Sequence, residues 1–331
     1  MGTTTPFDLN PWPAFGFSDD ARPALMRALQ KGPAILVTIV DLQGGGPRPV
    51  GTQMVFGQDE VSGFLSGGCI EADVALHAAA CRDDGQPRRL VYGAGSPWPD
   101  IRLLCGARLE VLVERVLPDD AAAAALRVYA KTRQPALWVT DGVQRACTLP
   151  DHAQPWLGAF KRRFDPTPRL VVFGGDPTAL AIANLGVSCG HETWLVRPNG
   201  PSDAPPVAGV NYSRAAPDKA LADIGLDAWS AVAVCHHDMD LDEAALKIAL
   251  PSDAPYVGLL GARARLPERL ARLRQAGIVE RHMAKLRAPI GLDLGGKAPF
   301  EIAVAVLGEI TAVRNSDLTS PIPGLAAGLF D

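Results

Sequence analysis

The residues whose types and spacing best suit chemistry lie in the stretch SGGCIEADVALHAAA, from Ser66 to Ala80. Gly67 and Gly68 stand directly before Cys69, and the apolar residues that follow recur at helical spacing. Paired glycines adopt backbone angles closed to other residues, so N–H groups at such a helix start can bind an anion or favour a thiolate. The stretch predicts either a reactive Cys69 in an anion-binding turn or a tight turn around a small inert cysteine.

A second cysteine, Cys105, also adjoins a glycine, Gly106. The other four have apolar or strand-like neighbours and are predicted to pack in the core; they are Cys81, Cys147, Cys189 and Cys235. No C-x-x-C pair occurs, so neither a zinc ribbon nor a disulfide scaffold is indicated. The adjacent His236 and His237 point to opposite sides of an extended chain, so we predict no metal site made by protein side chains alone.

A glycine turn in the second half of the chain carries part of the fingerprint of dinucleotide binding. GGDPTA begins with Gly174 and Gly175, but Asp176 follows, and Ala179 stands where the last glycine belongs. Arg197 follows the next predicted strand, at a position where NAD-binding proteins have an acidic residue. An arginine there indicates either that the site binds the 2′-phosphate of NADP or that the protein binds no NAD. We therefore keep NAD(P) only as an alternative cofactor.

Two further strand ends carry groups that suit an anion. In GLLGARAR, Gly261 and Arg263 precede a predicted helix, which indicates either an anion site or arginines on the surface. His237 follows another predicted strand, at the carboxyl edge where open α/β sheets bind ligands.

The elements that must position these residues follow two patterns. Over residues 1–150, helices and strands lie between Gly- and Pro-rich loops, which predicts a mixed α+β domain. Residues 151–168 carry prolines and the basic run KRR and are predicted to be a linker. Over residues 169–331, strands and helices alternate regularly, which predicts a Rossmann-like doubly wound parallel sheet. The chain is therefore predicted to be an α/β protein.

The composition excludes several classes of protein. Of 331 residues, 47% are hydrophobic and 21% are charged, which is typical of a globular protein of two domains. The formal net charge of −4 gives no concentrated positive charge for nucleic acid. No apolar run approaches the roughly 20 residues that span a bilayer, and the first residues do not have the form of a secretion signal. We expect a cytoplasmic protein that has no membrane span and binds no nucleic acid.

The motifs together resemble those of the XdhC/CoxI family, which are maturation factors of molybdenum hydroxylases such as xanthine dehydrogenase and carbon monoxide dehydrogenase. The resemblance runs from Gly32 to Arg314 through GGGPRPVGTQM, SGGCIE, LLCGARLEVLVE, HDMDLDEAAL, YVGLLGAR and PIGLDLGGKAPFEIAVAVLGEI. The family's usual G-A-G-H-V-G turn and the acidic residue after it are replaced here by GGDPTA and Arg197. The resemblance therefore does not imply that the second half binds a nucleotide.

The resemblance implies a chaperone, rather than an enzyme, that receives molybdenum cofactor and delivers it to an apo molybdenum hydroxylase. In some members a cysteine desulfurase first supplies a sulfur ligand, and a homodimer is compatible with the family. The residues implied to bind the cofactor are Arg48, Gly67, Gly68, Cys69, Glu71, Cys105 and Gly106. They belong to three loops, 43–51, 66–71 and 104–107, which we predict to converge.

The implied roles follow from the chemistry of the side chains. Arg48 suits the phosphate of the cofactor, and the thiols of Cys69 and Cys105 suit molybdenum. Glu71 suits either the pterin edge or only the dipole of its helix. Two other functions stay open: an NAD(P)-dependent oxidoreductase that uses the second half, and a sulfurtransferase that carries a persulfide on Cys69.

Overall fold

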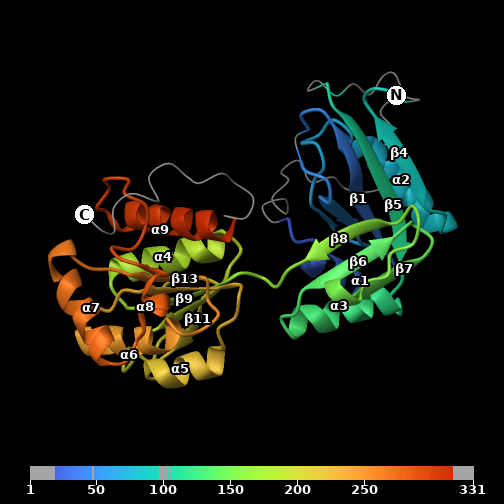
Figure 1. Ribbon diagram of the computed structural model, residues 1–331. Coiled ribbons are helices and arrows are strands. Elements are labelled where there is room, and N and C mark those ends of the chain that lie inside the picture. Colours follow the sequence, from blue (N-terminus) through green and yellow to red (C-terminus); the bar gives the residue numbers. More distant parts are fainter. Residues whose placement is uncertain (1–18, 47, 97–102, 104–105, 316–331) are drawn as a thin grey trace. The chain divides into compact units, whose positions relative to one another are not determined.

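The computed structural model describes residues 19–46, 48–96, 103 and 106–315. The chain divides into two compact units, residues 1–166 and 167–331, each with cores of its own (Figure 1). The division falls within the segment 151–168, for which the sequence predicts a linker.

Two antiparallel sheets form the first unit, with strand orders β3-β2-β1-β5-β4 and β7-β6-β8. The larger sheet comprises β1 (Ala34–Gln43), β2 (Gln53–Phe56), β3 (Val61–Ser62), β4 (Arg88–Tyr92) and β5 (Arg108–Val116). The smaller comprises β6 (Ala136–Thr140), β7 (Arg145–Thr148) and β8 (Phe160–Phe164). The helical elements of this unit are α1 (Arg22–Lys31), α2 (Glu71–Asp84), α3 (Ala121–Lys131) and the short 3-10 turn η2 (Pro150–His152).

β8 lies where the sequence predicts only a linker. It pairs along β6, with Phe164 opposite Ala136, so the basic run KRR belongs to a strand of the smaller sheet. Phe164 is buried in the core cluster that also contains Leu25 of α1. The burial of this phenylalanine outweighs the polar composition of the segment, since burying such a side chain contributes about 1.5–3 kcal/mol.

α2 begins directly after the SGGC turn, and its apolar stripe fixes it to the larger sheet. The stripe is fully buried in one core cluster and consists of Ile70, Val74, Ala78 and Cys81. Glu71 and Asp73 fall in the first helical turn, where negative charge suits the helix dipole. The helix predicted from the apolar spacing is confirmed. Because its apolar stripe is buried, the helix also fixes the position of the SGGC turn that precedes it.

One parallel sheet forms the second unit, with the strand order β11-β10-β9-β12-β13-β14. Its strands are β9 (Arg169–Phe173), β10 (Glu192–Val196), β11 (Asn211–Ser213), β12 (Ser230–Val234), β13 (Tyr256–Leu259) and β14 (Leu286–Arg287). The helical elements are α4 (Pro177–Ser188), α5 (Pro217–Ile224), α6 (Met239–Ala249), η3 (Arg263–Arg265), α7 (Leu266–Gln275), α8 (Glu280–Met283) and α9 (Pro299–Arg314).

Helices cover both faces of this sheet. Alternate residues of β9 enter opposite cores: Leu170 and Val172 pack with α4 and α9, whereas Val171 and Phe173 pack with α5 and α6 (Figure 1). The strand order reverses between β9 and β12, and the carboxyl ends of these two strands therefore form the switch point at which such sheets bind ligands. The predicted fold class, with its Rossmann-like doubly wound sheet, is confirmed.

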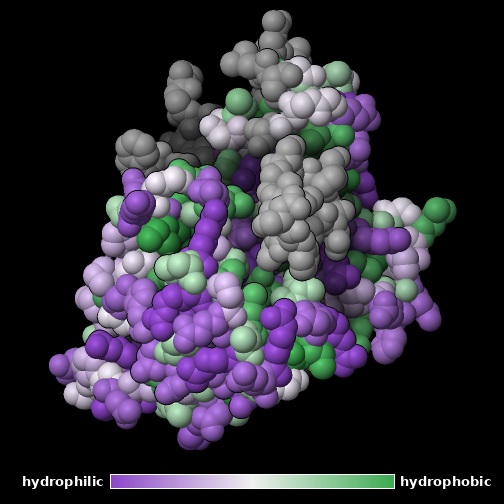
Figure 2. Space-filling view, turned by 60° about the vertical axis from the view of Figure 1, so that its left-hand side comes forward, coloured by the Kyte–Doolittle hydropathy of each residue, from purple (hydrophilic) through white to green (hydrophobic). Residues whose placement is uncertain are grey.

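The surface and the cysteines add two observations. The face in Figure 2 is mostly hydrophilic, with hydrophobic residues in small separate groups, and no helix of the described residues is long and apolar enough to cross a membrane. Cys81, Cys147 and Cys235 are buried as predicted. Cys189 is exposed, contrary to prediction, because it follows the last residue of α4 at the surface instead of lying on its packed face.

Candidate functional site

The three loops implied to bind the cofactor leave the same end of the larger sheet. Because neighbouring strands of that sheet are antiparallel, the end of β1 lies beside the starts of β2 and β5. The segments that join β1 to β2, β3 to α2 and β4 to β5 all begin at this end. The strand topology thus gathers segments that are far apart in the sequence.

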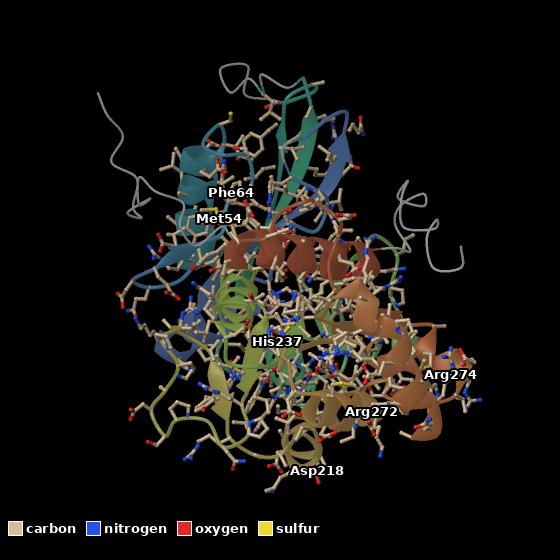
Figure 3. All side chains as sticks on the ribbon, turned by 90° about the vertical axis from the view of Figure 1, so that its left-hand side faces the viewer. Met54, Phe64, Asp218, His237, Arg272 and Arg274 are labelled. Carbon is tan, nitrogen blue, oxygen red and sulfur yellow. The ribbon has the colours of Figure 1, made fainter. Side chains whose placement is uncertain are left out.

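Contacts between described residues join these loops. The Arg48 guanidinium lies over the ring of Phe64, 4.7 Å from its centroid, and Phe64 comes shortly after β3 and before the SGGC turn (Figure 3). A Cβ added to Gly44 would lie 3.8 Å from the carbonyl oxygen of Gly106. The first loop therefore touches both the approach to the SGGC turn and the last loop.

Arg48 has an acidic partner within the protein. It forms an ion pair with Asp19, whose side chain is 57% exposed, while that of Arg48 is 22% exposed. An ion pair at the surface contributes about 1 kcal/mol or less. A phosphate that approaches this guanidinium therefore competes with one weakly held carboxylate. Cys105 lies outside the described residues, so its place beside Cys69 stays a prediction.

Glu71 holds the SGGC turn from within the protein. Its carboxylate accepts six hydrogen bonds of 2.6–3.2 Å, from the Ser66 hydroxyl and from the backbone N–H groups of Leu65, Ser66, Gly67, Gly68 and Ile70. Burial raises the pKa of Glu71, but the hydrogen bonds from Ser66 and Leu65 outweigh it, so this pKa lies below its ordinary value.

The glycine amides are therefore not free for an outside anion, and that expectation is wrong. The anion they bind is the carboxylate of Glu71, which sits at the first position of α2 and reaches back to the residues before the helix. A sequence signal for this contact existed, because an acidic residue in the first turn commonly accepts from N–H groups at the helix start. Glu71 fixes the turn and is buried, so the structure gives it a positioning role.

Cys69 is exposed on this turn, which excludes the interpretation of a buried inert cysteine. Its backbone N–H donates to the Ser66 hydroxyl at 2.9 Å. Gly67 and Gly68 have φ values of 84° and 118°, and a Cβ on either would meet no atom within 4 Å. The glycines are thus required by the backbone conformation rather than by crowding, and the space around the thiol is open.

A polar group that sequence reasoning missed lies further along α2. The Tyr92 hydroxyl donates to Asp73 at 2.6 Å, and His77 Nε2 lies 3.6 Å from the same carboxylate oxygen. Burial, together with the hydrogen bond to Asp73, raises the pKa of Tyr92 far above its ordinary value. The spacing of Asp73 and His77 was the available signal, because residues four apart on a helix share a face.

In the second unit, the turn that would hold a dinucleotide phosphate is filled by protein groups. Asp176 caps α4 by accepting from the N–H of Ala179 at 2.8 Å. The side chain of Arg197 lies so close to Gly175 that a Cβ there would overlap it, and a Cβ on Gly174 would meet the Cys235 carbonyl oxygen at 2.8 Å. One N–H of the helix start is thus taken by Asp176, and a carboxylate and a guanidinium lie in the turn where the dinucleotide fingerprint has only glycine.

The remaining predicted residues lie at other strand ends of the same sheet. His237 has a left-handed φ of 62°, and its Nε2 lies 3.3 Å from Asp176 (Figure 3). Arg263 is exposed and forms a surface ion pair with Asp293 at 3.4 Å. Among the described residues, no group of three or more His, Cys, Asp or Glu side chains could hold a metal ion.

Known proteins are similar to this chain in sequence and in fold. Residues 28–93 match the model of the XdhC and CoxI family, and residues 170–310 match that of the XdhC Rossmann domain. The chain is 30% identical over 304 residues to the molybdenum cofactor insertion chaperone PaoD of Escherichia coli (strain K12), and the match covers 90% of each chain.

One further relative and one solved structure are similar to this chain. A protein of Bacillus subtilis (strain 168) that is named as a probable subunit of xanthine dehydrogenase is 26% identical over 321 residues, which is 85% of this chain and 93% of the relative. A crystal structure described as a xanthine dehydrogenase from Bacillus halodurans has the same fold, with a TM-score of 0.72 and 22% identity over 91% of this chain and 98% of that one. The chain belongs to the XdhC and CoxI family.

Proposed function

We propose that this protein binds molybdenum cofactor at the loop end of the larger sheet in the first unit and delivers it to an apo molybdenum hydroxylase. The observation that carries the proposal is the exposed Cys69 on a turn whose amides are held by Glu71. A thiol that is fixed in place yet open to solvent can bind a metal without first being uncovered.

The neighbouring groups suit the rest of the cofactor. Arg48 can bind the phosphate in place of Asp19, since a guanidinium pairs with phosphate by two parallel hydrogen bonds. Asp73 and His77, on the helix that follows the SGGC turn, would supply polar groups for the pterin edge. Sulfur is a soft ligand of the kind that binds such metals, so Cys69, with Cys105 as the predicted second thiol, would contact molybdenum.

The relatives support delivery to a hydroxylase. PaoD is named a molybdenum cofactor insertion chaperone, and the relative from Bacillus subtilis is named a probable xanthine dehydrogenase subunit. We include in the proposal an apo hydroxylase of this class as partner, the cytoplasm as location, and a cysteine desulfurase and a homodimer as further associations. NAD(P) is not proposed, because Asp176 and Arg197 fill the turn it would need.

The test is cofactor retention by Cys69→Ser, with Cys189→Ser as the matched control because Cys189 is also an exposed free cysteine but lies in the second unit. Both variants and the unaltered protein are co-expressed with the enzymes that make the cofactor, and molybdenum and pterin are measured per protein. Loss of a group that only supports a metal ligand lowers metal affinity by about 10–100-fold. Loss of the ligand itself should therefore lower retention in Cys69→Ser by at least about tenfold.

Equal retention by all three proteins would refute a role of Cys69 in binding. The same exposed thiol supports a second candidate, a persulfide carrier for the sulfur ligand. Incubation with a cysteine desulfurase and cysteine would then add the mass of one sulfur atom to the unaltered protein and to Cys189→Ser, but not to Cys69→Ser. No mass gain on Cys69 would remove this candidate.

A further inference from the structure

A partly buried arginine of β8 lies against the loop that carries Arg48. A Cβ added to Gly51 would lie 2.7 Å from Nη1 of Arg162 and 3.3 Å from its Cδ. Gly51 follows Arg48 in the segment that joins β1 to β2, and its φ of 90° also favours glycine. The side chain of Arg162 therefore occupies the space that a larger residue at position 51 would fill.

Arg48 and Arg162 meet at the same residue. The guanidinium of Arg48 forms an ion pair with the Asp19 carboxylate, and Nη2 of Arg162 donates to the Asp19 carbonyl oxygen at 3.3 Å. The side chain of Asp19 is 57% exposed. Two guanidiniums, one from β8 and one from the segment between β1 and β2, thus converge on one exposed acidic residue.

Aromatic rings hold both guanidiniums in place. The guanidinium carbon of Arg48 lies 4.7 Å from the centroid of the Phe64 ring, and that of Arg162 lies 5.3 Å from the centroid of the Phe164 ring. A cation at such a distance over a ring is attracted to its face. Because both side chains are already fixed, they lose less conformational entropy when they bind a ligand.

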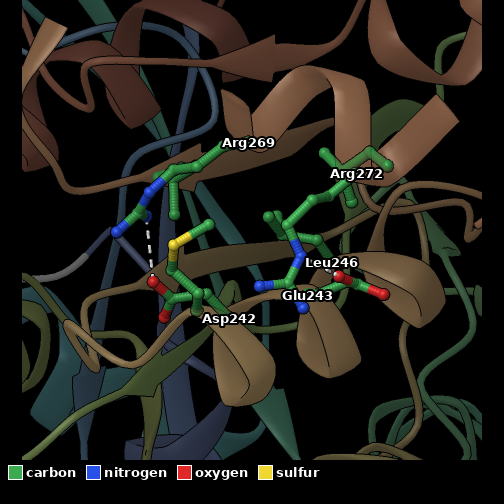
Figure 4. Close-up of a pocket in the computed structure, with 8 residues that line it drawn as sticks. Asp242, Glu243, Leu246, Arg269 and Arg272 are labelled. Atoms are coloured by element: carbon green, nitrogen blue, oxygen red, sulfur yellow. Dashed lines mark hydrogen bonds and ion pairs between the residues drawn. The ribbon is translucent and has the colours of Figure 1, made fainter. Parts of the chain in front are cut away.

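Buried guanidiniums elsewhere in the chain are balanced by a carboxylate. Arg269 of α7, whose side chain is 10% exposed, pairs with Asp242 of α6 at 2.9 Å (Figure 4). Arg22 of α1, whose side chain is 8% exposed, pairs with Asp20 at 2.8 Å. Such pairing offsets the free energy that a guanidinium loses when it leaves water.

Arg162 has no such partner. Among the residues that the structure describes, it forms no ion pair, and its one hydrogen bond is that to the Asp19 carbonyl oxygen. Burial lowers the pKa of Arg162, and the charge of Asp20, which raises this pKa, does not compensate. A partly buried cation without a carboxylate partner points to an anion supplied from outside the chain.

The outer nitrogens of Arg162 can be reached by such an anion. Nε is the one nitrogen of this side chain that is both buried and without a hydrogen-bond partner in the described part of the chain. Nη1 also has no acceptor there, so it is not enclosed by protein. The bond from Nη2 is long for an N–H···O contact, and a charged oxygen can replace the carbonyl as its acceptor.

We propose that Arg48 and Arg162 together bind one phosphate group, and that the Asp19 carboxylate competes with this phosphate for Arg48. Two guanidiniums supply paired N–H donors and two positive charges, which suit the charge of about −1.5 to −2 that a phosphate monoester carries at pH 7. That this phosphate belongs to molybdenum cofactor rests on the function proposed above. Arg162 lies outside the three loops and so adds a fourth segment to the site.

The neighbouring Arg163 provides a matched control. Adjacent residues of a strand point to opposite sides, and Arg163 pairs with Asp165 at 2.8 Å with a side chain that is 54% exposed. Arg163→Gln therefore removes the same charge from the same strand, whereas Arg162→Gln removes the guanidinium that lies beside Gly51.

The first measurement is isothermal titration calorimetry of the full chain with inorganic phosphate. Arg162→Gln should weaken binding by at least about tenfold, the factor that corresponds to one charge-assisted hydrogen bond, and Arg163→Gln should leave binding unchanged. Asp19→Asn removes the competing charge at an exposed position, so this variant should fold and bind phosphate about two- to fivefold more tightly.

Three results would overturn the phosphate site: no binding of inorganic phosphate by the unaltered protein, equal binding by the unaltered protein and Arg162→Gln, or equal weakening by Arg162→Gln and Arg163→Gln. Circular dichroism shows whether Arg162→Gln is folded. Should it fail to fold, Asp19→Asn decides the matter, and unchanged phosphate binding by that variant would overturn the proposal.

The second measurement separates this proposal from the proposed function. Each protein is co-expressed with the enzymes that make the cofactor, and pterin is measured per protein. Lower retention by Arg162→Gln than by Arg163→Gln assigns the phosphate to the cofactor. Retention by Arg162→Gln equal to that of the unaltered protein refutes the role of Arg162 and leaves the proposed function standing. Phosphate binding by a protein that retains no pterin refutes the proposed function and supports a site for free phosphate.

Discussion

At the residue scale, the main result is the assignment of Glu71. A motif of two glycines, a cysteine and a glutamate suggested an open anion site, but the glutamate itself is the anion. One buried carboxylate thereby accepts from five backbone donors and one hydroxyl in the turn beside Cys69.

The first prediction concerns this carboxylate. Hydrogen bonds to a charged group contribute about 1.5–3 kcal/mol, so Glu71→Gln should lower the free energy of unfolding at pH 7 by about 2 kcal/mol. The pKa of Glu71 in the fold lies below its ordinary value of 4.5, so its ionised form stabilises the fold. That contribution is present above pH 4.5 and is lost as the pH falls through the folded pKa.

Urea unfolding of the unaltered protein and Glu71→Gln from pH 7 to acid measures this effect. The difference between the two proteins should shrink as the pH falls below 4.5. Asp83→Asn is the control, because Asp83 lies on the same helix with a side chain that is 79% exposed. A difference that stays constant with pH, or that Asp83→Asn reproduces, would contradict the role given to Glu71.

At the scale of elements, Asp176 occupies the start of α4, which is where a dinucleotide phosphate binds in Rossmann domains. Asp176 caps the helix and also lies 3.3 Å from His237, which has an unusual left-handed backbone conformation. The Asp176 carboxylate accepts from one of the N–H groups that a pyrophosphate at a helix start would use. The glycine turn before α4 therefore ends in an internal cap.

The second prediction follows from the cap. Asp176→Ala should lower the free energy of unfolding by about 1 kcal/mol, because the N–H of Ala179 loses its acceptor. Asp218→Ala provides the comparison: Asp218 lies exposed in the first turn of α5, where no side chain of the described residues caps the helix (Figure 3). Urea unfolding of both variants measures the costs, and equal costs would mean that Asp176 does not act as a cap.

At the scale of the whole molecule, the chain consists of two units with separate cores. Two clusters of buried residues belong to the first unit and two to the second. The sequence places the predicted boundary at residues 151–168, and the division after Pro166 lies at the end of that segment, beyond β8.

The third prediction is that the two units fold independently. Fragments 1–166 and 167–331, expressed separately, should each unfold cooperatively, because each keeps its own buried clusters. Circular dichroism during thermal unfolding measures this. A fragment cut at residue 150 should be less stable than 1–166, since it lacks β8 and the buried Phe164. Failure of either unit to fold alone would refute the proposed domain division.

The sequence by itself determined the α/β class, most of the helices and strands, and the family. These features depend on the spacing of apolar residues and on short motifs, which are local properties, as the buried stripe of α2 illustrates. It did not predict β8, because a strand rich in arginine is stabilised by its pairing with β6 and not by its composition.

The tertiary structure alone decided which donors and acceptors meet. It paired the glycine amides with Glu71, set Asp176 and Arg197 in the dinucleotide turn, and left the buried Nε of Arg269 without a hydrogen-bond partner. A hydrogen bond depends on positions within about 3 Å, and such positions are fixed only once distant segments have packed together. The sequence therefore specified the elements and the residue types of the sites, whereas the packing of the chain decided which of those groups are free to bind a ligand.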